Sequence, residues 1–265
     1  MNTRRPHRLY QLYIIDLDGT VYLGDRLLPT ARETICQLRE LGARVVFVSN
    51  NPTRTREYYA QKLTRLGIPT SAQEVINSTV VLVDYLKQRA PQARLFVIGE
   101  EPLCAELQAA GFVLTKNLHE IDVVVASFDR TFNYTKLQIG FDALRRGARF
   151  VATNPDPFCP VPGGGQPDAG AVIAALSAST GRKPEAVVGK PSTLMVRTIL
   201  NTLGSRPEDC LIVGDRLETD VRMGVEAGID TALVLTGVTT RDDLKTTPVE
   251  PTYVLEQLAD LVPDI

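Results

Sequence analysis

Residues 13–20, Tyr-Ile-Ile-Asp-Leu-Asp-Gly-Thr, constrain what this chain can fold into more than any other stretch. They predict an apolar strand that runs into two aspartates, Asp16 and Asp18, and then into a glycine. Side chains two positions apart on a strand share a face, so both carboxylates lie on one side if the strand continues that far. Two carboxylates this close need a cation or a shared proton. The stretch therefore indicates an active site or, alternatively, a solvated Asp-Gly turn after an ordinary strand.

The segments that follow predict a parallel sheet. Strands are expected over residues 9–18 and 43–51, and helices over 30–42 and 55–66. Residues 21–29 have alternating and turn-like character, with Gly24-Asp25 as the expected tip of a hairpin. Alternating strands and helices give parallel pairing with right-handed crossovers, and ligands bind beyond the carboxyl ends of such strands. The polar strand ends at residues 16–20 and 49–51 should therefore lie on one edge of the sheet.

A second α/β series occupies the middle of the chain, and the last third resumes the first pattern with strands expected over residues 186–190 and 210–215. We therefore predict an α/β fold with a Rossmann-like, doubly wound parallel-sheet core and a second, inserted α/β domain. The expected ranges are 1–78 for the first part of the core, 79–183 for the insertion and 184–265 for the second part of the core. Residues 154–167, rich in Pro and Gly, are expected to form a loop.

Composition excludes several classes of partner and cofactor. A formal net charge of -2 gives no reason to expect nucleic acid or an acidic membrane surface as a partner. The four cysteines form no C-x-x-C pair, which argues against a zinc site or a disulfide framework and fits the cytoplasm. Two histidines are too few for a His-rich metal site. The N-terminal stretch reads as neither a signal peptide nor a membrane span, so we expect no membrane partner.

Four strand ends carry reactive groups: the Asp16 and Asp18 pair, residues 49–51, Lys190, and Asp215 within residues 214–220. If all four meet at one sheet edge, at least three carboxylates face one ammonium group. Clustered carboxylates favour a hard divalent cation, above all Mg²⁺, and a lysine with hydroxyl and amide donors suits a phosphate dianion. One carboxylate can attack phosphorus to form an aspartyl-phosphate, while a second moves the proton.

These motifs resemble those of the haloacid dehalogenase superfamily of phosphohydrolases. Residues 16–21 (Asp-Leu-Asp-Gly-Thr-Val) match its first motif, Ser49 its second, Lys190 its third, and the pair Gly214-Asp215 its fourth. The resemblance covers essentially the whole chain. The long insertion between the second and third motifs is similar to a type 2 cap domain, and residues 49–51, 167–170, 180–184, 189–192 and 214–220 resemble the NagD-like, 4-nitrophenylphosphatase-type branch.

The resemblance implies a role for each matched residue. Asp16 would be the nucleophile and Asp18 the acid/base. Mg²⁺ would be held by Asp16, the backbone carbonyl of Asp18, Asp215, and Asp220, the last directly or through water. The phosphoryl group would be bound by Ser49, Asn50, Asn51 and Lys190. Residues 153–160 resemble the substrate-specificity loop of such caps, with Asn154, Asp156 and Cys159 as candidate contacts.

Each residue taken alone has a structural alternative. Lys190 could be a surface lysine before a proline, Ser49 a helix cap, and Cys159 a small filler of the loop. For Glu218 we expect only an electrostatic role at a helix N-terminus. Some members of the family carry a different residue at the position of Cys159, so their substrate preference cannot be transferred to this chain.

The resulting expectation is a Mg²⁺-dependent phosphomonoester hydrolase. It would act on a small phosphorylated metabolite, such as a sugar phosphate or phosphoglycolate, with 4-nitrophenyl phosphate as an artificial substrate. The alternatives are a phosphotransferase or mutase with the same intermediate, and a phospho-aspartate signalling receiver domain. A homodimer is expected from the family, and the sequence leaves the physiological substrate and pathway open.

Overall fold

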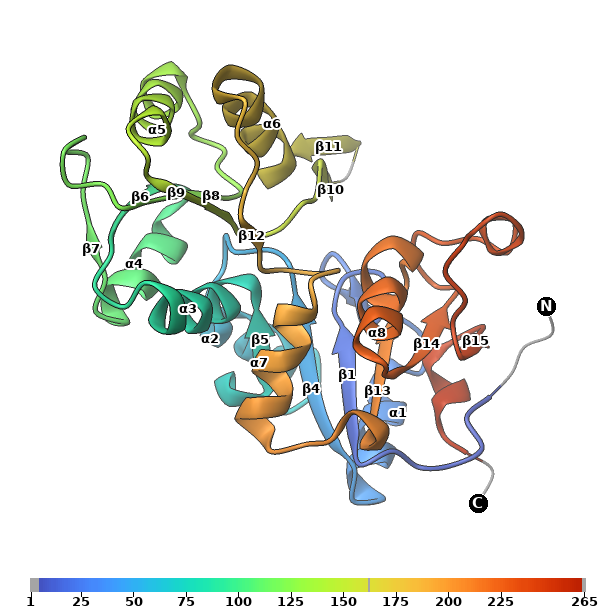
Figure 1. Cartoon of the computed structure of the whole chain (residues 1–265). Coiled ribbons are helices and arrows are strands. Elements are labelled where there is room, and N and C mark those ends of the chain that lie inside the picture. The colour runs from blue at the N-terminus through green and yellow to red at the C-terminus, as the bar shows by residue number, and fades with distance from the viewer. Residues whose placement is uncertain (1–4, 162, 264–265) are drawn as a thin grey trace. The chain divides into compact units, whose positions relative to one another are not determined.

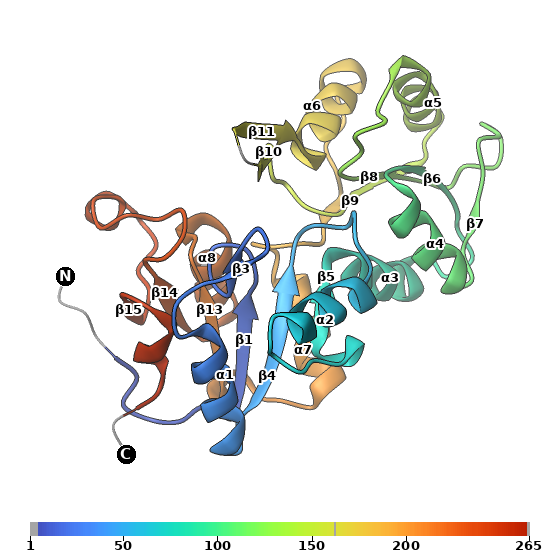
Figure 2. The same cartoon turned by 180° about the vertical axis from the view of Figure 1, so that it is seen from behind.

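The computed structural model describes residues 5–161 and 163–263, which form two compact units. Unit 1 contains the described residues of 1–49, 56–76 and 190–265, and unit 2 contains those of 50–55 and 77–189. Each unit is built on its own parallel sheet with helices on both faces (Figures 1 and 2). The predicted α/β fold class, with a Rossmann-like core and an additional α/β region, is confirmed.

The sheet of unit 1 has six strands in the order β15-β14-β13-β1-β4-β5. Its central strands are entirely buried, as expected when helices cover both faces of a parallel sheet. Register places Ile15 of β1 beside Phe47 of β4 and Val213 of β13. The strands are β1 (Leu12–Asp16), β4 (Arg44–Ser49), β5 (Val75–Asn77), β13 (Cys210–Gly214), β14 (Asp230–Val234) and β15 (Tyr253–Leu255).

Alternate residues of these strands face two helical layers. Tyr13, Ile15 and Phe47 share a buried core with side chains of the first helical layer, α1 (Ala31–Glu40) and α2 (Arg56–Arg65). The opposite layer contains α7 (Thr193–Leu203) and α8 (Arg222–Ala227), which pack against each other (Figure 1). The N-terminus of α7 is fixed by Ser192, whose side chain accepts a hydrogen bond from Leu194 N–H. The antiparallel pair β2 (Tyr22–Leu23) and β3 (Arg26–Leu27) forms the hairpin expected around residues 24–25.

Unit 2 has a five-stranded sheet in the order β12-β9-β8-β6-β7, and all of its neighbouring strands are parallel. The strands are β6 (Arg94–Ile98), β7 (Val113–Leu114), β8 (Val123–Ala126), β9 (Arg149–Ala152) and β12 (Ala186–Val187). Helices α5 and α6 pack over one face, and α3 and α4 lie on the other (Figures 1 and 2). The helices are α3 (Ser78–Arg89), α4 (Glu101–Ala109), α5 (Tyr134–Arg145) and α6 (Ala169–Thr180).

Two local expectations differ from the structure. Residues 154–167, expected as a loop, contain the antiparallel hairpin β10 (Phe158–Val161) and β11 (Gly164–Pro167). Its paired residues are mostly exposed and include two prolines and two glycines, so no alternation of apolar residues marked it as strands. Strand β12, expected in the second part of the core, pairs with β9 in the sheet of unit 2. Strand β12 consists of only two half-buried residues, Ala186 and Val187, and nothing in their sequence favours one sheet over the other. The expected division at residues 78 and 183 stays a prediction.

Across residues 5–161 and 163–263, no helix combines the length and the apolar composition that a bilayer crossing requires.

Candidate active site

Three buried aspartates from separate segments meet at the carboxyl edge of the unit 1 sheet. Asp16 is the last residue of β1, Asp215 directly follows β13, and Asp220 lies in a π-helical turn, Leu217–Val221. Each offers one carboxylate oxygen, and these oxygens all lie within 4.8 Å of one another. Relative exposure is 7%, 0% and 1% respectively, so solvent screens their mutual repulsion only weakly.

Lys190 is the cation of this cluster. Its side chain is buried, and its ammonium group forms ion pairs with Asp16 Oδ1 and, at 2.8 Å, with Asp220 Oδ1. The alternative of a surface lysine is therefore wrong. One positive charge against three carboxylates still leaves the cluster negative when all of its groups are ionised.

Burial and repulsion shift the ionisation of these groups. Desolvation raises the pKa of Asp16 well above its ordinary value, opposed by the charge of Lys190 and reinforced by Asp220 and Asp215. Desolvation, helped by Asp220, raises the pKa of Asp215 to about 6. Burial alone would lower the pKa of Lys190, but Asp16 and Asp220 outweigh it and raise that pKa above the usual value. The site therefore disfavours its own negative charge and would be relieved by a further cation.

Asp215 is held by a loop that follows β14. The backbone N–H of Val238 donates to Asp215 Oδ2 (2.7 Å), and the N–H of Thr239 donates to the Asp215 carbonyl oxygen (3.1 Å). A Cβ atom at Gly237 would lie 2.0 Å from Asp215 Oδ2. A Cβ at Gly19, whose φ is +90°, would lie 2.5 Å from the same oxygen. Only glycine fits at either position without displacing this carboxylate.

The other oxygen of Asp215 suggests what the cluster binds. Asp215 Oδ1 is buried and has no hydrogen-bond partner among the described residues, although a buried carboxylate oxygen normally has one. The possible metal ligands of this cluster are all carboxylate oxygens, and its net charge is negative when its groups are ionised. Asp16, Asp215 and Asp220 therefore fit a hard divalent cation.

Asp18 occupies the turn beyond β1. It is exposed to solvent and pairs with Tyr22 in an isolated bridge, where Gly19 N–H donates to the Tyr22 carbonyl oxygen (2.9 Å). Desolvation by the surrounding protein raises the pKa of Asp18, and the charges of Lys62 and Lys190 oppose that rise. A carboxyl group that is open to solvent and has a raised pKa is suited to proton transfer.

Ser49 and the two asparagines after it follow β4. Ser49 is buried at the end of this strand, in unit 1. Asn50 and Asn51 belong to unit 2. Asn50 Nδ2 donates to Asp156 Oδ2 (2.7 Å), and Asn51 Oδ1 accepts from Thr53 N–H (2.9 Å) and from its hydroxyl group (2.7 Å). The Asn51 side chain thus holds the conformation of its own segment, whereas the Asn50 side chain ties that segment to residue 156.

The proposed specificity loop lies in unit 2. Asn154 is fully buried, whereas Asp156 and Cys159 are partly exposed. Cys159 lies on β10.

Some contributors to this site were missed by the sequence reasoning. Lys62 of α2 places its ammonium 3.6 Å from the centre of the Tyr22 ring, and it lies within electrostatic reach of Asp18. No spacing pattern marks this lysine. The loop of Gly237 and Val238 could have been found, because the polar residues 236–240 follow a strand end as those of the other motifs do.

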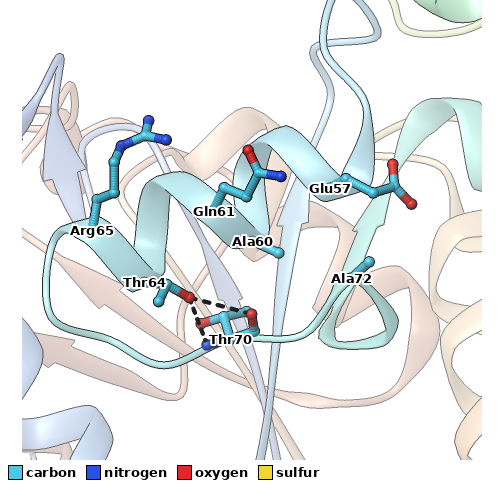
Figure 3. Close-up of a pocket in the computed structure, with 7 residues that line it drawn as sticks. All are labelled: Glu57, Ala60, Gln61, Thr64, Arg65, Thr70 and Ala72. Carbon is cyan, nitrogen blue, oxygen red and sulfur yellow. Dashed lines mark hydrogen bonds between the residues drawn. The ribbon is translucent and has the colours of Figure 1, made fainter.

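A surface pocket of about 440 Å³ lies elsewhere on unit 1, along α2 and the segment after it (Figure 3). Thr64 Oγ1 accepts a hydrogen bond from Thr70 N–H (3.1 Å) beside it. None of the predicted site residues lines this pocket. Its lining residues are Glu57, Ala60, Gln61, Thr64, Arg65, Thr70 and Ala72.

Two family models and several known proteins are similar to this chain. The model of haloacid dehalogenase-like hydrolases matches residues 13–113, and a second model of the same group, HAD-hydrolase-like, matches residues 187–261. The chain is 35% identical over 258 residues to the 5'-nucleotidase YutF of Bacillus subtilis, covering 97% of this chain and 100% of that one. It is 37% identical over 249 residues to an acid sugar phosphatase of Staphylococcus epidermidis, covering 94% and 95%. The crystal structure of 4-nitrophenylphosphatase from Thermotoga maritima matches with a TM-score of 0.91 and 39% identity, covering 95% and 96%.

The fold, the buried acids and these matches define a hydrolase, and the chain belongs to the haloacid dehalogenase-like hydrolase family. Within that family it is a phosphatase of the NagD-like, 4-nitrophenylphosphatase-type group.

Proposed function

We propose that this protein is a Mg²⁺-dependent phosphomonoesterase that works through an aspartyl-phosphate on Asp16. The observation that carries the proposal is the buried group of Asp16, Asp215 and Asp220 around Lys190 at one sheet edge. Three acids with a single lysine suit a dianionic substrate only if a further cation is bound. A site that combines carboxylates, a lysine and a bound divalent cation is typical of enzymes that transfer phosphoryl groups.

In the first step an oxygen of Asp16 attacks phosphorus, and the bond from phosphorus to the ester oxygen breaks. Lys190 already contacts the Asp16 carboxylate, so it holds the nucleophile in place, and its charge favours the ionised carboxylate against the desolvation that raises the pKa of Asp16. The same ammonium group offsets negative charge on the phosphoryl oxygens during transfer.

Asp18 carries the proton. Its raised pKa lets it hold a proton for the departing alkoxide and then accept one from water. That water attacks the aspartyl-phosphate, which releases inorganic phosphate and restores the Asp16 carboxylate. The exposure of Asp18 to solvent fits this second half of the cycle.

The remaining polar groups bind the metal and the phosphate. We propose that Asp16, the backbone carbonyl of Asp18, Asp215 and, through water, Asp220 hold Mg²⁺, which would supply Lewis-acid polarisation of the phosphoryl group. Ser49, at the buried end of β4, would bind phosphoryl oxygens together with Asn50 and Asn51.

The substrate class rests on the relatives. Those named acid sugar phosphatase and 4-nitrophenylphosphatase favour a small phosphorylated metabolite for this chain, and the 5'-nucleotidase adds nucleoside monophosphates as candidates. In unit 2, Asn154, Asp156 and Cys159 would contact the leaving group. We further propose a cytoplasmic homodimer, which sedimentation analysis would test.

The function is tested with a panel of phosphorylated metabolites with and without Mg²⁺. We expect the chain to release phosphate from 4-nitrophenyl phosphate and from at least one small sugar phosphate, phosphoglycolate or nucleoside monophosphate. Removal of divalent metal with EDTA should reduce the rate by more than about 100-fold, because the single ammonium group of Lys190 would then face three buried acids and the dianion. Added Mg²⁺ should restore the rate. Equal activity with and without metal would reject the proposal.

The same assay separates the alternative functions. A phosphotransferase or mutase would pass the phosphoryl group to an added sugar or alcohol rather than to water. A signalling receiver would retain labelled phosphate on the protein for hours instead of turning over. Phosphate release with water as the only acceptor contradicts both.

Replacing Gly237 by Ala should weaken metal binding. The new Cβ would lie 2.0 Å from Asp215 Oδ2 and force this ligand to move. Loss of a group that orients a ligand typically costs about 10- to 100-fold in metal affinity, and we expect a loss of that size for Mg²⁺, measured by calorimetry. Val238→Ala is the matched control, because it changes an exposed side chain of the same loop and keeps the N–H that donates to Asp215. Equal affinity of the two variants would contradict this role of the loop.

A further inference from the structure

A hydrogen-bond network in unit 2 joins the residue after Ser49 to the proposed specificity loop. Asp156 Oδ2 accepts from Asn50 Nδ2 at 2.7 Å and from Asn154 Nδ2 at 2.8 Å. Asn154 Nδ2 also donates to Asp168 Oδ1 at 3.0 Å, and Asp168 caps the N-terminus of α6. A carboxylate that accepts from two amide groups fixes both of them more strongly than a neutral acceptor would.

Two glycines show how closely the backbone packs around this network. A Cβ at Gly189 would lie 2.6 Å from Asn50 Oδ1 and 2.6 Å from the carbonyl oxygen of Thr153. A Cβ at Gly170 would lie 2.8 Å from the carbonyl oxygen of Asp156. The Gly189 N–H donates to the Thr153 carbonyl oxygen at 2.7 Å. The segment of Asn50, the loop and the end of β12 thus hold one another in a single arrangement.

The network is linked to the proposed phosphate-binding residues through peptide bonds. Asn50 directly follows Ser49, and Gly189 directly precedes Lys190. Two of the residues proposed to bind the phosphoryl group, Ser49 and Lys190, are therefore each bonded to a residue that packs in or against this network. A shift of the loop at Asp156 would be transmitted to Asn50 by a hydrogen bond, and from Asn50 to Ser49 by one peptide bond.

We propose that Asp156 is a positioning residue that couples the specificity loop to the phosphate-binding strand end. Through Asn50 it makes the rate of phosphoryl transfer depend on the conformation of the loop that receives the leaving group. This inference rests on the proposed phosphatase function. It assigns to Asp156 a task besides leaving-group contact, namely the alignment of Ser49 and Asn50 against phosphorus.

The test compares Asp156→Ala and Asp156→Asn with the wild type on 4-nitrophenyl phosphate with Mg²⁺. Hydrogen bonds to a charged group contribute amounts that correspond to about 10- to 100-fold in rate, so we expect kcat of Asp156→Ala to fall by that factor. KM should change by less than about threefold, because alignment matters most in the transition state. Asp156→Asn keeps one acceptor oxygen, so its kcat should lie between those of Asp156→Ala and the wild type. Asp142→Asn is the control, since Asp142 is also partly exposed in unit 2 and accepts from one side-chain amide, that of Gln138.

A double-mutant cycle with Asn50→Ala separates positioning from general destabilisation. If Asp156 acts through Asn50, the double variant Asn50→Ala/Asp156→Ala should be no slower than the slower single variant. Fully multiplicative effects on kcat, or an unchanged kcat in Asp156→Ala, would overturn the inference while leaving the phosphatase function intact. A wild-type protein that releases no phosphate would overturn both. Thermal unfolding of each variant is recorded alongside, and a loss of kcat that only follows a loss of folded protein also counts against the coupling.

Discussion

Asp16→Asn should reduce phosphate release by about 10⁴-fold or more, because the amide cannot attack phosphorus and no other carboxylate occupies the end of β1. The protein should still fold. Asparagine has nearly the shape of aspartate, and Lys190 keeps its ion pair with Asp220. Burial already opposes the negative charge of Asp16, so a neutral group at this position should cost little stability.

The measurement pairs 4-nitrophenyl phosphate hydrolysis with thermal unfolding. Asp242→Asn serves as control, since the side chain of Asp242 is 86% exposed and pairs only with a surface lysine. Slow deamidation of the new asparagine would regenerate aspartate, so mass spectrometry must accompany any residual rate. Activity of Asp16→Asn near that of the control would contradict the nucleophilic mechanism.

Lys190→Met should lower both stability and activity. Removing one partner of a buried ion pair typically costs about 3 to 5 kcal/mol, because it leaves an uncompensated buried charge. Here it would leave the buried Asp16 and Asp220 without the ammonium group that pairs with both of them. We therefore expect the free energy of unfolding at pH 7 and without metal to fall by roughly that amount. Phosphate release should fall by about 100-fold or more, as for other preorganised charged groups.

The pH dependence of this variant follows from the same charges. Desolvation already holds the pKa values of Asp16 and Asp215 above their unfolded values, and loss of Lys190 removes a charge that lowers both. A carboxyl group with a raised folded pKa contributes stability at low pH and loses it as the pH rises through the folded value. The difference between Lys190→Met and the wild type should therefore be smaller at pH 5 than at pH 7.

Urea unfolding at both pH values measures this effect, with tyrosine near-ultraviolet circular dichroism reporting on unit 1, where Tyr10, Tyr13 and Tyr22 are buried. Added Mg²⁺ should recover part of the loss at pH 7, because the proposed metal site is built from the same acids in the folded state. Lys245→Met, at an exposed ion pair, should match the wild type at both pH values. A Lys190→Met variant as stable as this control would show that the acids do not need the lysine.

Much of the fold was readable from local signals. The buried strands at residues 12–16, 44–49 and 210–214 are continuous apolar runs that end in polar residues, and each structural strand lies within its predicted range. The hairpin around residues 24–25 was predicted from its turn residues. By contrast, β10 and β11 pair through exposed residues that include prolines and glycines, so neither hydrophobic periodicity nor strand propensity indicated them.

The sequence by itself determined the class of this protein as a phosphatase, because carboxylates, a lysine and a hydroxyl group, which suit a hard cation and a phosphate, follow in order at its predicted strand ends. Only the tertiary structure decided which of these groups pair with one another and how far their charges are compensated. It pairs Lys190 with both Asp16 and Asp220, leaves Asp215 Oδ1 without a partner among the described residues, and supports Asp215 with Val238 from a distant loop. Such contacts join residues far apart in the chain, and their strength depends on burial, which no local pattern of residue types encodes.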